Sequence, residues 1–362
     1  MKRLLLISIL ALGMLTMVFS SSAFAKPKMV IDPQEQQAVI DYINGNSTLI
    51  DSVVVYHNGT TVMEEYFAGY SGTTPHDTQS ATKSITSALI GIAIDKGIIA
   101  SVDQPIYQLL PKKYGYLFTE DSTGDKEDIT VRMLLTMTSG LKWVDFGPDS
   151  SFTKLFAAPD SVAFILAEPL VTAPGAAFEY NTGSSHLLSA IIHYRSGMTT
   201  QKFAQKYLFR PLGIKEKDYQ WYGHPDGIAY GGMGLWMKPV DMLEFGKLYL
   251  NEGRIAASHG HERKYGEARK HKAMVLTPEW VIESVKPWVY VGPTSYYGYL
   301  WWKPTYFSTT ADVAHAAGWG GQSIFVVGDL DLVIVTTAAV TSDPNYFYSY
   351  YVPNELIKAA LD

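Results

Sequence analysis

The stretch Gln79-Ser80-Ala81-Thr82-Lys83-Ser84 stands directly before a run of apolar residues at helical spacing. That run contains Ile85, Ala88, Leu89, Ile92 and Ala93. Lys96-Gly97 follows it and supplies the cation and glycine that commonly end a helix. Because positions i and i+3 lie on one helical face, the pattern predicts that Ser80 and Lys83 are neighbours near a helix start.

This S-x-x-K spacing brings a hydroxyl and an amine within reach of each other. A serine hydroxyl is a poor nucleophile until a neighbour removes its proton, and an uncharged lysine amine can be that base. The alternative is a purely structural role, in which the serine caps the helix and the lysine is exposed. The same spacing recurs at Ser151-Phe152-Thr153-Lys154, after Pro148-Asp149-Ser150, where it predicts only a capped short helix.

A second candidate is Tyr180-Asn181-Thr182-Gly183, which follows the turn Pro174-Gly175 and precedes a predicted helix over Leu187 to Tyr194. A tyrosine at a loop-to-helix junction can relay protons. It can also be a buried aromatic anchor beside a polar cap, and the 24 tyrosines make chance placement easy. Both interpretations of Tyr180 stay open on these residues alone.

The third candidate is His315-Ala316-Ala317-Gly318-Trp319-Gly320-Gly321-Gln322, which leads directly into an apolar strand. Glycine allows the backbone to approach a ligand closely, so an N–H here can complete an oxyanion hole. A glycine-rich bend that enters a core strand explains the pattern equally well. His186 and His315 lie near these motifs and either line the site or make structural hydrogen bonds.

Strand patterns occur at both ends of the chain, and helix patterns lie between them. Ser52 to Phe67 predicts a hairpin around His57-Asn58-Gly59, and two late runs, 323–327 and 332–337, flank the turn Gly328-Asp329. The intervening helix patterns are Val131–Met137, Leu187–Tyr194, Thr200–Phe209 and Val240–Tyr249, and Asn354–Leu361 predicts a terminal helix. The order predicts a discontinuous sheet domain, 26–78 with 287–362, around a mostly helical domain, 79–286.

The beginning of the chain has the pattern of an export signal. Lys2 and Arg3 precede an apolar run from Leu4 to Phe19, and Ala23-Phe24-Ala25 matches the sequence that signal peptidase accepts. We expect residues 1–25 to be removed between Ala25 and Lys26, and the protein to be periplasmic or secreted by a bacterium. An uncleaved anchor is the alternative, although the run is shorter than the roughly 20 residues of a spanning helix.

Composition excludes several kinds of chemistry. The chain has 362 residues and no cysteine, so disulfides, a thiolate nucleophile and a lipid-bearing cysteine are impossible. The net charge of -6 gives no reason to expect nucleic acid. His259, His261, Glu262 and His271 lie in a polar, basic stretch, 258–272, which predicts a solvated loop rather than a metal site. We expect neither metal nor cofactor.

In this order, the three motifs resemble the serine β-lactamase and penicillin-binding-protein superfamily. The likeness is to its class C-related branch, with esterases, D-amino-acid peptidases and 6-aminohexanoate-dimer hydrolases. It covers nearly all of the expected mature chain and includes VRMLLTMTSGL at 131–141, PLG at 211–213, GLWMKPVD at 234–241 and YGYLWW at 297–302. The resemblance implies an α+β fold, an antiparallel sheet flanked by helices plus an inserted mostly helical domain.

The resemblance also implies roles for individual residues. Ser80 would be the acylated nucleophile and Lys83 the base. Tyr180 would protonate the leaving group or help activate water. The backbone N–H groups of Ser80 and Trp319 would form the oxyanion hole. The expected function is an exported serine hydrolase that cleaves a small ester, amide or peptide-like substrate.

Two departures from the family pattern bear on the substrate. Thr182 stands where the Tyr-x-Asn motif has asparagine, although Asn181 is adjacent, and Ala316-Ala317-Gly318 replaces Lys-Thr-Gly. We expect Thr182, Asn181, Gly318 and His315 to contact substrate, and efficient penicillin hydrolysis is not expected. The alternatives are a β-lactamase or cell-wall DD-peptidase, and a non-catalytic envelope-binding protein. Aromatics at Trp301-Trp302 and Trp319 predict either an apolar substrate surface or core packing.

Overall fold

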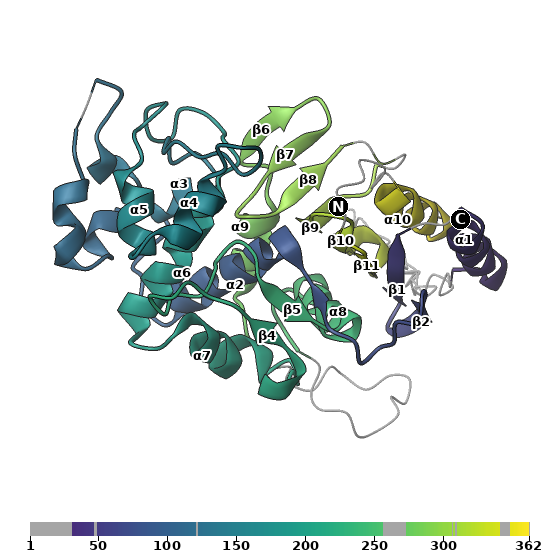
Figure 1. The fold of residues 1–362 in the computed structure, drawn as a ribbon. Helices are drawn as coiled ribbons and strands as arrows, with labels where there is room; N and C mark the ends of the chain where they lie inside the picture. Colours follow the sequence, from purple (N-terminus) through teal and green to yellow (C-terminus); the bar gives the residue numbers. More distant parts are fainter. Residues whose placement is uncertain are drawn as a thin grey trace, which may run out of the picture.

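An antiparallel sheet brings the two ends of the chain together. The computed structural model describes residues 31–46, 49–120, 122–255, 273–305, 307, 310–340 and 348–361. Eight strands run in the order β2-β1-β11-β10-β9-β8-β7-β6. Their bounds are β1 Ile50–His57, β2 Thr60–Tyr66, β6 Val289–Gly292, β7 Ser295–Tyr297, β8 Trp302–Pro304, β9 Val313–Gly318, β10 Gln322–Val327 and β11 Leu332–Ala338. Strands from the beginning and end of the sequence therefore lie side by side (Figure 1).

Both predicted hairpins are confirmed. Asn58 and Gly59 have φ angles of 50° and 92° between β1 and β2, as a tight asparagine-glycine turn requires. Gly328–Leu330 forms a short 3₁₀ turn between β10 and β11, and Asp331 follows in the left-handed region. Turn residues thus set the register of two strand pairs, one at the β2 edge of the sheet and one further inside it.

Helices cover both faces of the sheet. α1 (Pro33–Gly45) and α10 (Tyr348–Ala359) lie together on one side, and α8 (Pro239–Leu250) lies on the other (Figure 1). Along β11, Leu332 and Ile334 face the α1 side, whereas Val333 and Val335 face the α8 side. A strand with both faces buried reads as a continuous apolar run, which explains the lack of polar alternation here.

The remaining helices form a mostly helical region beside the sheet. They are α2 (Thr82–Asp95), α3 (Val131–Leu135), α4 (Ser151–Ala157), α5 (Ser161–Ala167), α6 (Thr182–Ser196), α7 (Thr200–Ala204) and α9 (Pro278–Val285). A small second sheet joins β3 (His76–Asp77), β5 (Leu235–Met237) and β4 (Gln220–Trp221). The α+β architecture predicted from the sequence is confirmed.

α2 occupies the middle of this assembly. Its residues from Thr82 to Ala93 are all buried, and a helix that is covered all round is a core helix. One apolar cluster continues from the sheet through α2 into the helical region. The domain limits 26–78, 79–286 and 287–362 stay a prediction, and α8, which lies within 79–286, packs on the sheet.

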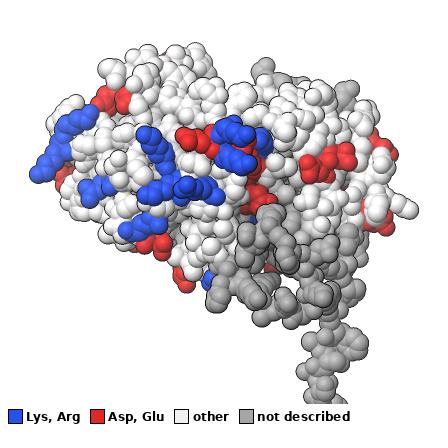
Figure 2. All heavy atoms as spheres, turned by 90° about the horizontal axis from the view of Figure 1, so that it is seen from below, with Lys and Arg blue, Asp and Glu red and all other residues white. Residues whose placement is uncertain are grey.

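Charged groups lie mainly at the surface. Lys and Arg gather over the left and central parts of the face in Figure 2, whereas Asp and Glu are more common toward its right. Ion pairs between such exposed charges contribute little to the free energy of unfolding. The apolar core must therefore stabilise this cysteine-free chain. In the described part of the chain, no helix combines the length and hydropathy needed to span a membrane.

Gly246 of α8 gives a test of the helix-on-sheet packing. A Cβ atom at Gly246 would lie 2.5 Å from Val333 Cγ1 and 2.9 Å from Ile324 Cγ2. We expect Gly246→Ala to lower the free energy of unfolding by about 1–3 kcal/mol in urea titrations, because the helix must move off the sheet. Gly45→Ala, where no atom lies within 4 Å, is the control and should change it by less than about 1 kcal/mol. Equal effects would contradict the packing argument.

Candidate active site

Ser80 and Lys83 meet at the start of the central helix. A short 3₁₀ turn, η1 (Gln79–Ala81), leads directly into α2, so the two residues are one turn apart. Lys83 Nζ lies 3.0 Å from Ser80 Oγ. The lysine side chain is only 1% exposed, while Ser80 is half-buried. The exposed-lysine alternative for this motif is therefore wrong.

Two backbone carbonyls hold α2 at this point. Lys83 Nζ donates to Gly232 O at 3.0 Å, and Thr86 Oγ1 donates to Gly231 O at 2.6 Å. A Cβ at Gly232 would lie 3.2 Å from Lys83 Nζ and 2.5 Å from Ser185 Oγ, so only glycine fits without displacement. No motif predicted this pair, although the glycine-rich run 231–234 was a signal for it.

Tyr180 lies beside the amine. The centroid of its ring is 4.8 Å from Lys83 Nζ. The ring stacks on Trp302 with centroids 5.8 Å apart, and Tyr297 meets it edge-on at 6.3 Å. The structure thus brings the three predicted catalytic residues together, and strands β7 and β8 supply the aromatic support for the phenol.

Asn181 and Thr182 have structural contacts at the start of α6. Asn181 Oδ1 accepts from the N–H of Ser184 at 2.9 Å, and its Nδ2 donates to Leu141 O at 2.9 Å. Both polar ends of Asn181 are thereby used inside the protein, where the residue is 1% exposed. Thr182 is also buried and donates to Asp145 Oδ2 at 3.2 Å. Predicted substrate contacts at these two side chains therefore compete with the helix cap of Asn181 and with the Thr182–Asp145 hydrogen bond.

Gly318 and Trp319 border the serine from the sheet side. A Cβ at Gly318 would lie 2.3 Å from Thr78 O and 3.1 Å from Gln79 Cβ, so the end of β9 touches the residues before Ser80. Trp319 follows in the β9–β10 turn with a 39% exposed side chain. The peptide of Trp319 therefore lies close to the turn that carries Ser80, where the predicted oxyanion hole needs it.

His315 lies away from this group. Its ring stacks on Phe325 at 3.9 Å and bonds to Ser323 Oγ at 3.0 Å. Phe325 belongs to the apolar cluster on the α1 side, whereas Ala314 and Ala316 belong to the cluster that contains α2. Because side chains alternate along a strand, His315 points to the face opposite Ser80. The predicted substrate contact at His315 is corrected to a structural role.

The tryptophans divide between core and site. Trp301 is fully buried and packs on Phe245 and Tyr249, so the core-packing interpretation holds for it. Trp302 instead stacks on Tyr180. Trp319 meets Phe146 with ring centroids 5.2 Å apart, and Phe146 is 65% exposed. Two tryptophans of the predicted apolar surface therefore border the Ser80 region.

Asp145 is a polar neighbour that our sequence analysis did not identify. Its carboxylate accepts from the indole N–H of Trp143 and the hydroxyl of Thr182. Thr182 in turn lies against Gly232, since a Cβ there would be 2.5 Å from Thr182 Cγ2. No motif marks this aspartate, because the contact depends on how the loop after Leu141 folds over α6.

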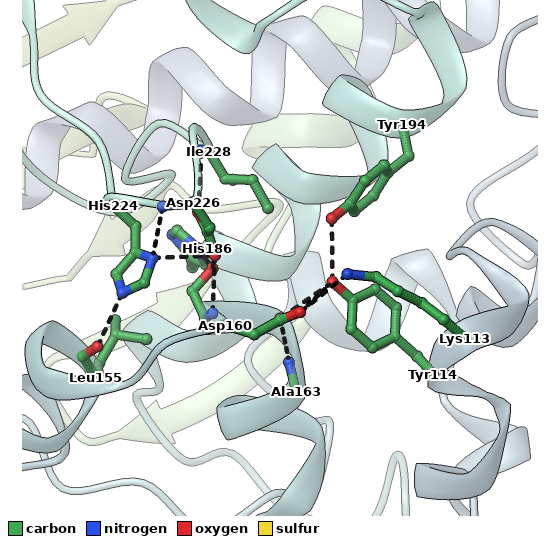
Figure 3. Close-up of polar contacts among 11 residues, drawn as sticks. Lys113, Tyr114, Leu155, Asp160, Ala163, His186, Tyr194, His224, Asp226 and Ile228 are labelled. Atoms are coloured by element: carbon green, nitrogen blue, oxygen red, sulfur yellow. Dashed lines mark hydrogen bonds and ion pairs between the residues drawn. The ribbon is translucent and has the colours of Figure 1, made fainter.

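A network of two buried histidines and Asp226 supports the loop that carries Gly231 and Gly232 (Figure 3). His224 Nδ1 lies 3.0 Å from Asp226 Oδ2, and Ser161 Oγ donates to the same oxygen at 2.7 Å. His186 Nε2 bonds to Ser161 Oγ at 2.8 Å, and burial lowers the pKa of His186 to about 4. The histidine near the second motif thus serves structure and links α6 to this loop.

Other sequence candidates have simple outcomes. The second S-x-x-K is a capped short helix, as predicted: Ser150 caps α4, Ser151 accepts from the N–H of Val144, and Lys154 is exposed. His259, His261, Glu262 and His271 lie outside the described residues, as do residues 1–25. Within the described ranges, no group of three or more His, Cys, Asp or Glu side chains is arranged to hold a metal ion.

Comparison with known families gives a match over most of the chain. The family model described as Beta-lactamase matches residues 44–348. Monacolin J acid methylbutanoyltransferase of Aspergillus terreus is 27% identical over 169 residues, which are 43% of this chain and 40% of that protein. The chain thus aligns with less than half the length of this relative. An uncharacterized protein of Alkalihalophilus pseudofirmus is 23% identical over 86% of this chain and 91% of its own length.

Solved structures share the fold at low sequence identity. A Bacillus anthracis protein with a provisional 6-aminohexanoate-dimer hydrolase assignment superimposes with a TM-score of 0.69 at 22% identity, over 89% of this chain and 81% of that chain. Simvastatin synthase from Aspergillus terreus has a TM-score of 0.64 at 16% identity, over 90% and 97% of the two chains. These likenesses show the common architecture.

The buried ring of His315 predicts acid sensitivity of the fold. Burial lowers its pKa to about 3, against about 6.5 in an unfolded chain. Between these values the unfolded chain binds a proton that the folded chain does not, so stability falls as pH falls. We expect His315→Gln to reduce the pH slope of the unfolding free energy by about 1.4 kcal/mol per pH unit between pH 6 and 4. Urea titrations at several pH values measure it, and equal slopes would refute the assignment.

Proposed function

The chain belongs to the beta-lactamase family, whose members are generally serine hydrolases and acyltransferases, and from this premise we propose that it is an exported serine hydrolase. Its substrate is a small ester, amide or peptide-like molecule. The observation that carries the proposal is the 3.0 Å contact between Ser80 Oγ and the buried amine of Lys83. A hydroxyl at that distance from an amine can lose its proton as it attacks a carbonyl carbon.

The reaction has two steps. In the first, the amine of Lys83 takes the proton of Ser80 Oγ, the oxygen bonds to the substrate carbonyl carbon, and the leaving alcohol or amine departs with a proton. In the second, water attacks the acyl-serine, its proton returns through the same groups, and the acid is released. Tyr180, with its ring 4.8 Å from Lys83 Nζ, is the proposed relay for these protons.

Backbone amides are the proposed oxyanion hole. The N–H of Ser80 stands at the start of α2, where the helix dipole favours negative charge. The Trp319 peptide follows Gly318, which abuts Thr78 and Gln79. Two such N–H groups would stabilise the tetrahedral oxyanion more than the ground-state carbonyl, which is the requirement for catalysis.

The surroundings favour an uncharged acyl or alcohol group. Ala316-Ala317-Gly318 supplies neither the cation nor the hydroxyl that holds a substrate carboxylate in the Lys-Thr-Gly relatives. The exposed rings of Phe146 and Trp319 instead offer apolar surface beside the serine. Relatives named for methylbutanoyl transfer act on a short branched acyl group, which agrees with an ester substrate for this chain.

Replacement of the two reacting groups tests the chemistry. We expect Ser80→Ala to abolish acylation by p-nitrophenyl acetate, on the order of a 10⁴-fold loss or more. Lys83→Met should lower the acylation rate by roughly 10²- to 10⁴-fold, the usual contribution of a general base. Stopped-flow burst kinetics give the rates, and intact-mass spectrometry shows whether an acetyl group is bound.

The second S-x-x-K motif provides a matched control. Lys154→Met removes the exposed lysine of this motif, and the variant should acylate like the wild type. Acetylation of Ser80→Ala at the wild-type rate would remove Ser80 from the mechanism. Stable labelling by a fluorescent penicillin, or turnover of a chromogenic cephalosporin, would instead indicate a DD-peptidase or a β-lactamase. Failure of every aryl ester and fluorophosphonate to label Ser80 would favour a binding protein.

The aromatic pair at the rim predicts acyl selectivity. We expect Phe146→Ala to lower kcat/KM for p-nitrophenyl hexanoate by roughly 5- to 30-fold, because the variant removes the apolar ring that would cover the hexanoyl group. The value for the acetate should change less than about 3-fold, because two carbons do not reach the pair. A matched change at an exposed ring elsewhere, Tyr116→Ala, should affect neither ester. Equal losses for both esters would show that the pair does not select the acyl group.

A further inference from the structure

The residue before the serine has an unusual backbone. Gln79 has a φ angle of 49°, in the left-handed region that residues with a β-carbon rarely occupy. The conformation persists only where surrounding contacts enforce it. Because the peptide between Gln79 and Ser80 carries the Ser80 N–H, the backbone angles of Gln79 decide where that donor points and where α2 begins.

Asp77 makes two contacts that enforce this conformation. Its Oδ1 accepts from the backbone N–H of Gln79 at 3.0 Å, and its Oδ2 accepts from the side-chain Nε2 of Gln79 at 2.6 Å. One carboxylate thus bonds both the main chain and the side chain of the residue two positions later. We call this pair of hydrogen bonds the Asp77–Gln79 clasp.

The clasp is fixed to a rigid support. Asp77 lies in β3 and pairs with Trp236 of β5. Thr78, between the two clasp residues, donates to Leu235 O from its N–H at 2.9 Å and from its hydroxyl at 2.8 Å. On the other side, Gly318 presses against Thr78 and Gln79. The turn before the serine is therefore held between β5 and β9.

We propose that Asp77 is a positioning residue that holds Gln79 in its left-handed conformation, so that Ser80 Oγ faces Lys83 while the Ser80 N–H faces the acyl oxygen. The inference rests on the proposed nucleophilic role of Ser80. Asp77 itself takes no part in proton transfer. Its effect passes through the backbone of Gln79. A residue at position 79 that adopts the left-handed conformation without support would therefore make the clasp unnecessary.

Glycine is such a residue, which gives the test. We expect Asp77→Ala to lower the acylation rate constant with p-nitrophenyl acetate by roughly 10- to 100-fold, because the strained turn relaxes in most molecules. Gln79→Gly should acylate within about 3-fold of the wild type, since glycine adopts positive φ freely. The double variant Asp77→Ala/Gln79→Gly should recover to within about 3-fold of Gln79→Gly alone.

The rescue separates positioning from other roles. If Asp77→Ala costs the same factor in the Gln79→Gly background, Asp77 acts on substrate or on general folding, and the proposal is overturned. An unchanged rate in Asp77→Ala alone overturns it as well. Asp77→Asn keeps an acceptor for the Gln79 N–H and should fall between wild type and alanine, which covers the case in which the alanine variant does not fold.

Two controls complete the experiment. Asp32 accepts from the N–H of Gln34 at 2.7 Å, which matches the backbone half of the clasp and lies at the start of α1, so Asp32→Ala should leave acylation unchanged. Ser80→Ala is assayed in parallel. If Ser80→Ala is acetylated like the wild type, the proposed function is overturned. If Ser80→Ala is not acetylated but Gln79→Gly does not rescue Asp77→Ala, only the proposed role of the clasp is overturned.

Discussion

The burial of one lysine amine constrains the whole site. Lys83 is only 1% exposed, and burying its amine without hydrogen-bond partners would cost folding free energy. Ser80 Oγ and Gly232 O are the two partners that satisfy it. Gly231 and Gly232 must consequently come close to α2, and the histidine–aspartate network behind them fixes the loop from which those carbonyls point. Satisfying one amine therefore brings two separate segments of the chain together.

Aromatic packing sets the second boundary of the site. Tyr180 comes from the start of α6, yet its ring rests on Trp302 and Tyr297 from the sheet. Across the serine, Trp319 from the β9–β10 turn meets Phe146 from the loop before α4. The helical region thus contributes Tyr180 and Phe146, and the sheet side contributes the three rings that they meet. The relative position of these two layers therefore determines the shape of the surface beside Ser80. A shift of either layer would change these contacts.

Local patterns in the sequence predicted much of this arrangement. The period of the apolar residues after Ser80 placed a helix there, and Asn58-Gly59 and Gly328-Asp329 marked two hairpins that the structure confirms. Family motifs outside the site indicated the α+β fold. The contacts that failed were those that depend on which face of an element a residue occupies. His315 alternates to the far side of β9. The substrate contact of Asn181 stays a prediction, and its side chain caps α6 through Oδ1. Asp145 and Gly232 were missed because their neighbours are distant in sequence.

The segment that carries Ser80 is hydrogen-bonded to parts of the chain that come much later in the sequence. Ser84 donates to the carbonyl of Leu300, 216 residues on, and Thr78 bonds to that of Leu235. β1 itself lies between β2 and β11. Contacts of such long separation close only when the last strands are available. A polypeptide that is still being synthesised therefore lacks the strands that position Ser80, so the surroundings of the proposed nucleophile are assembled only when synthesis is nearly finished.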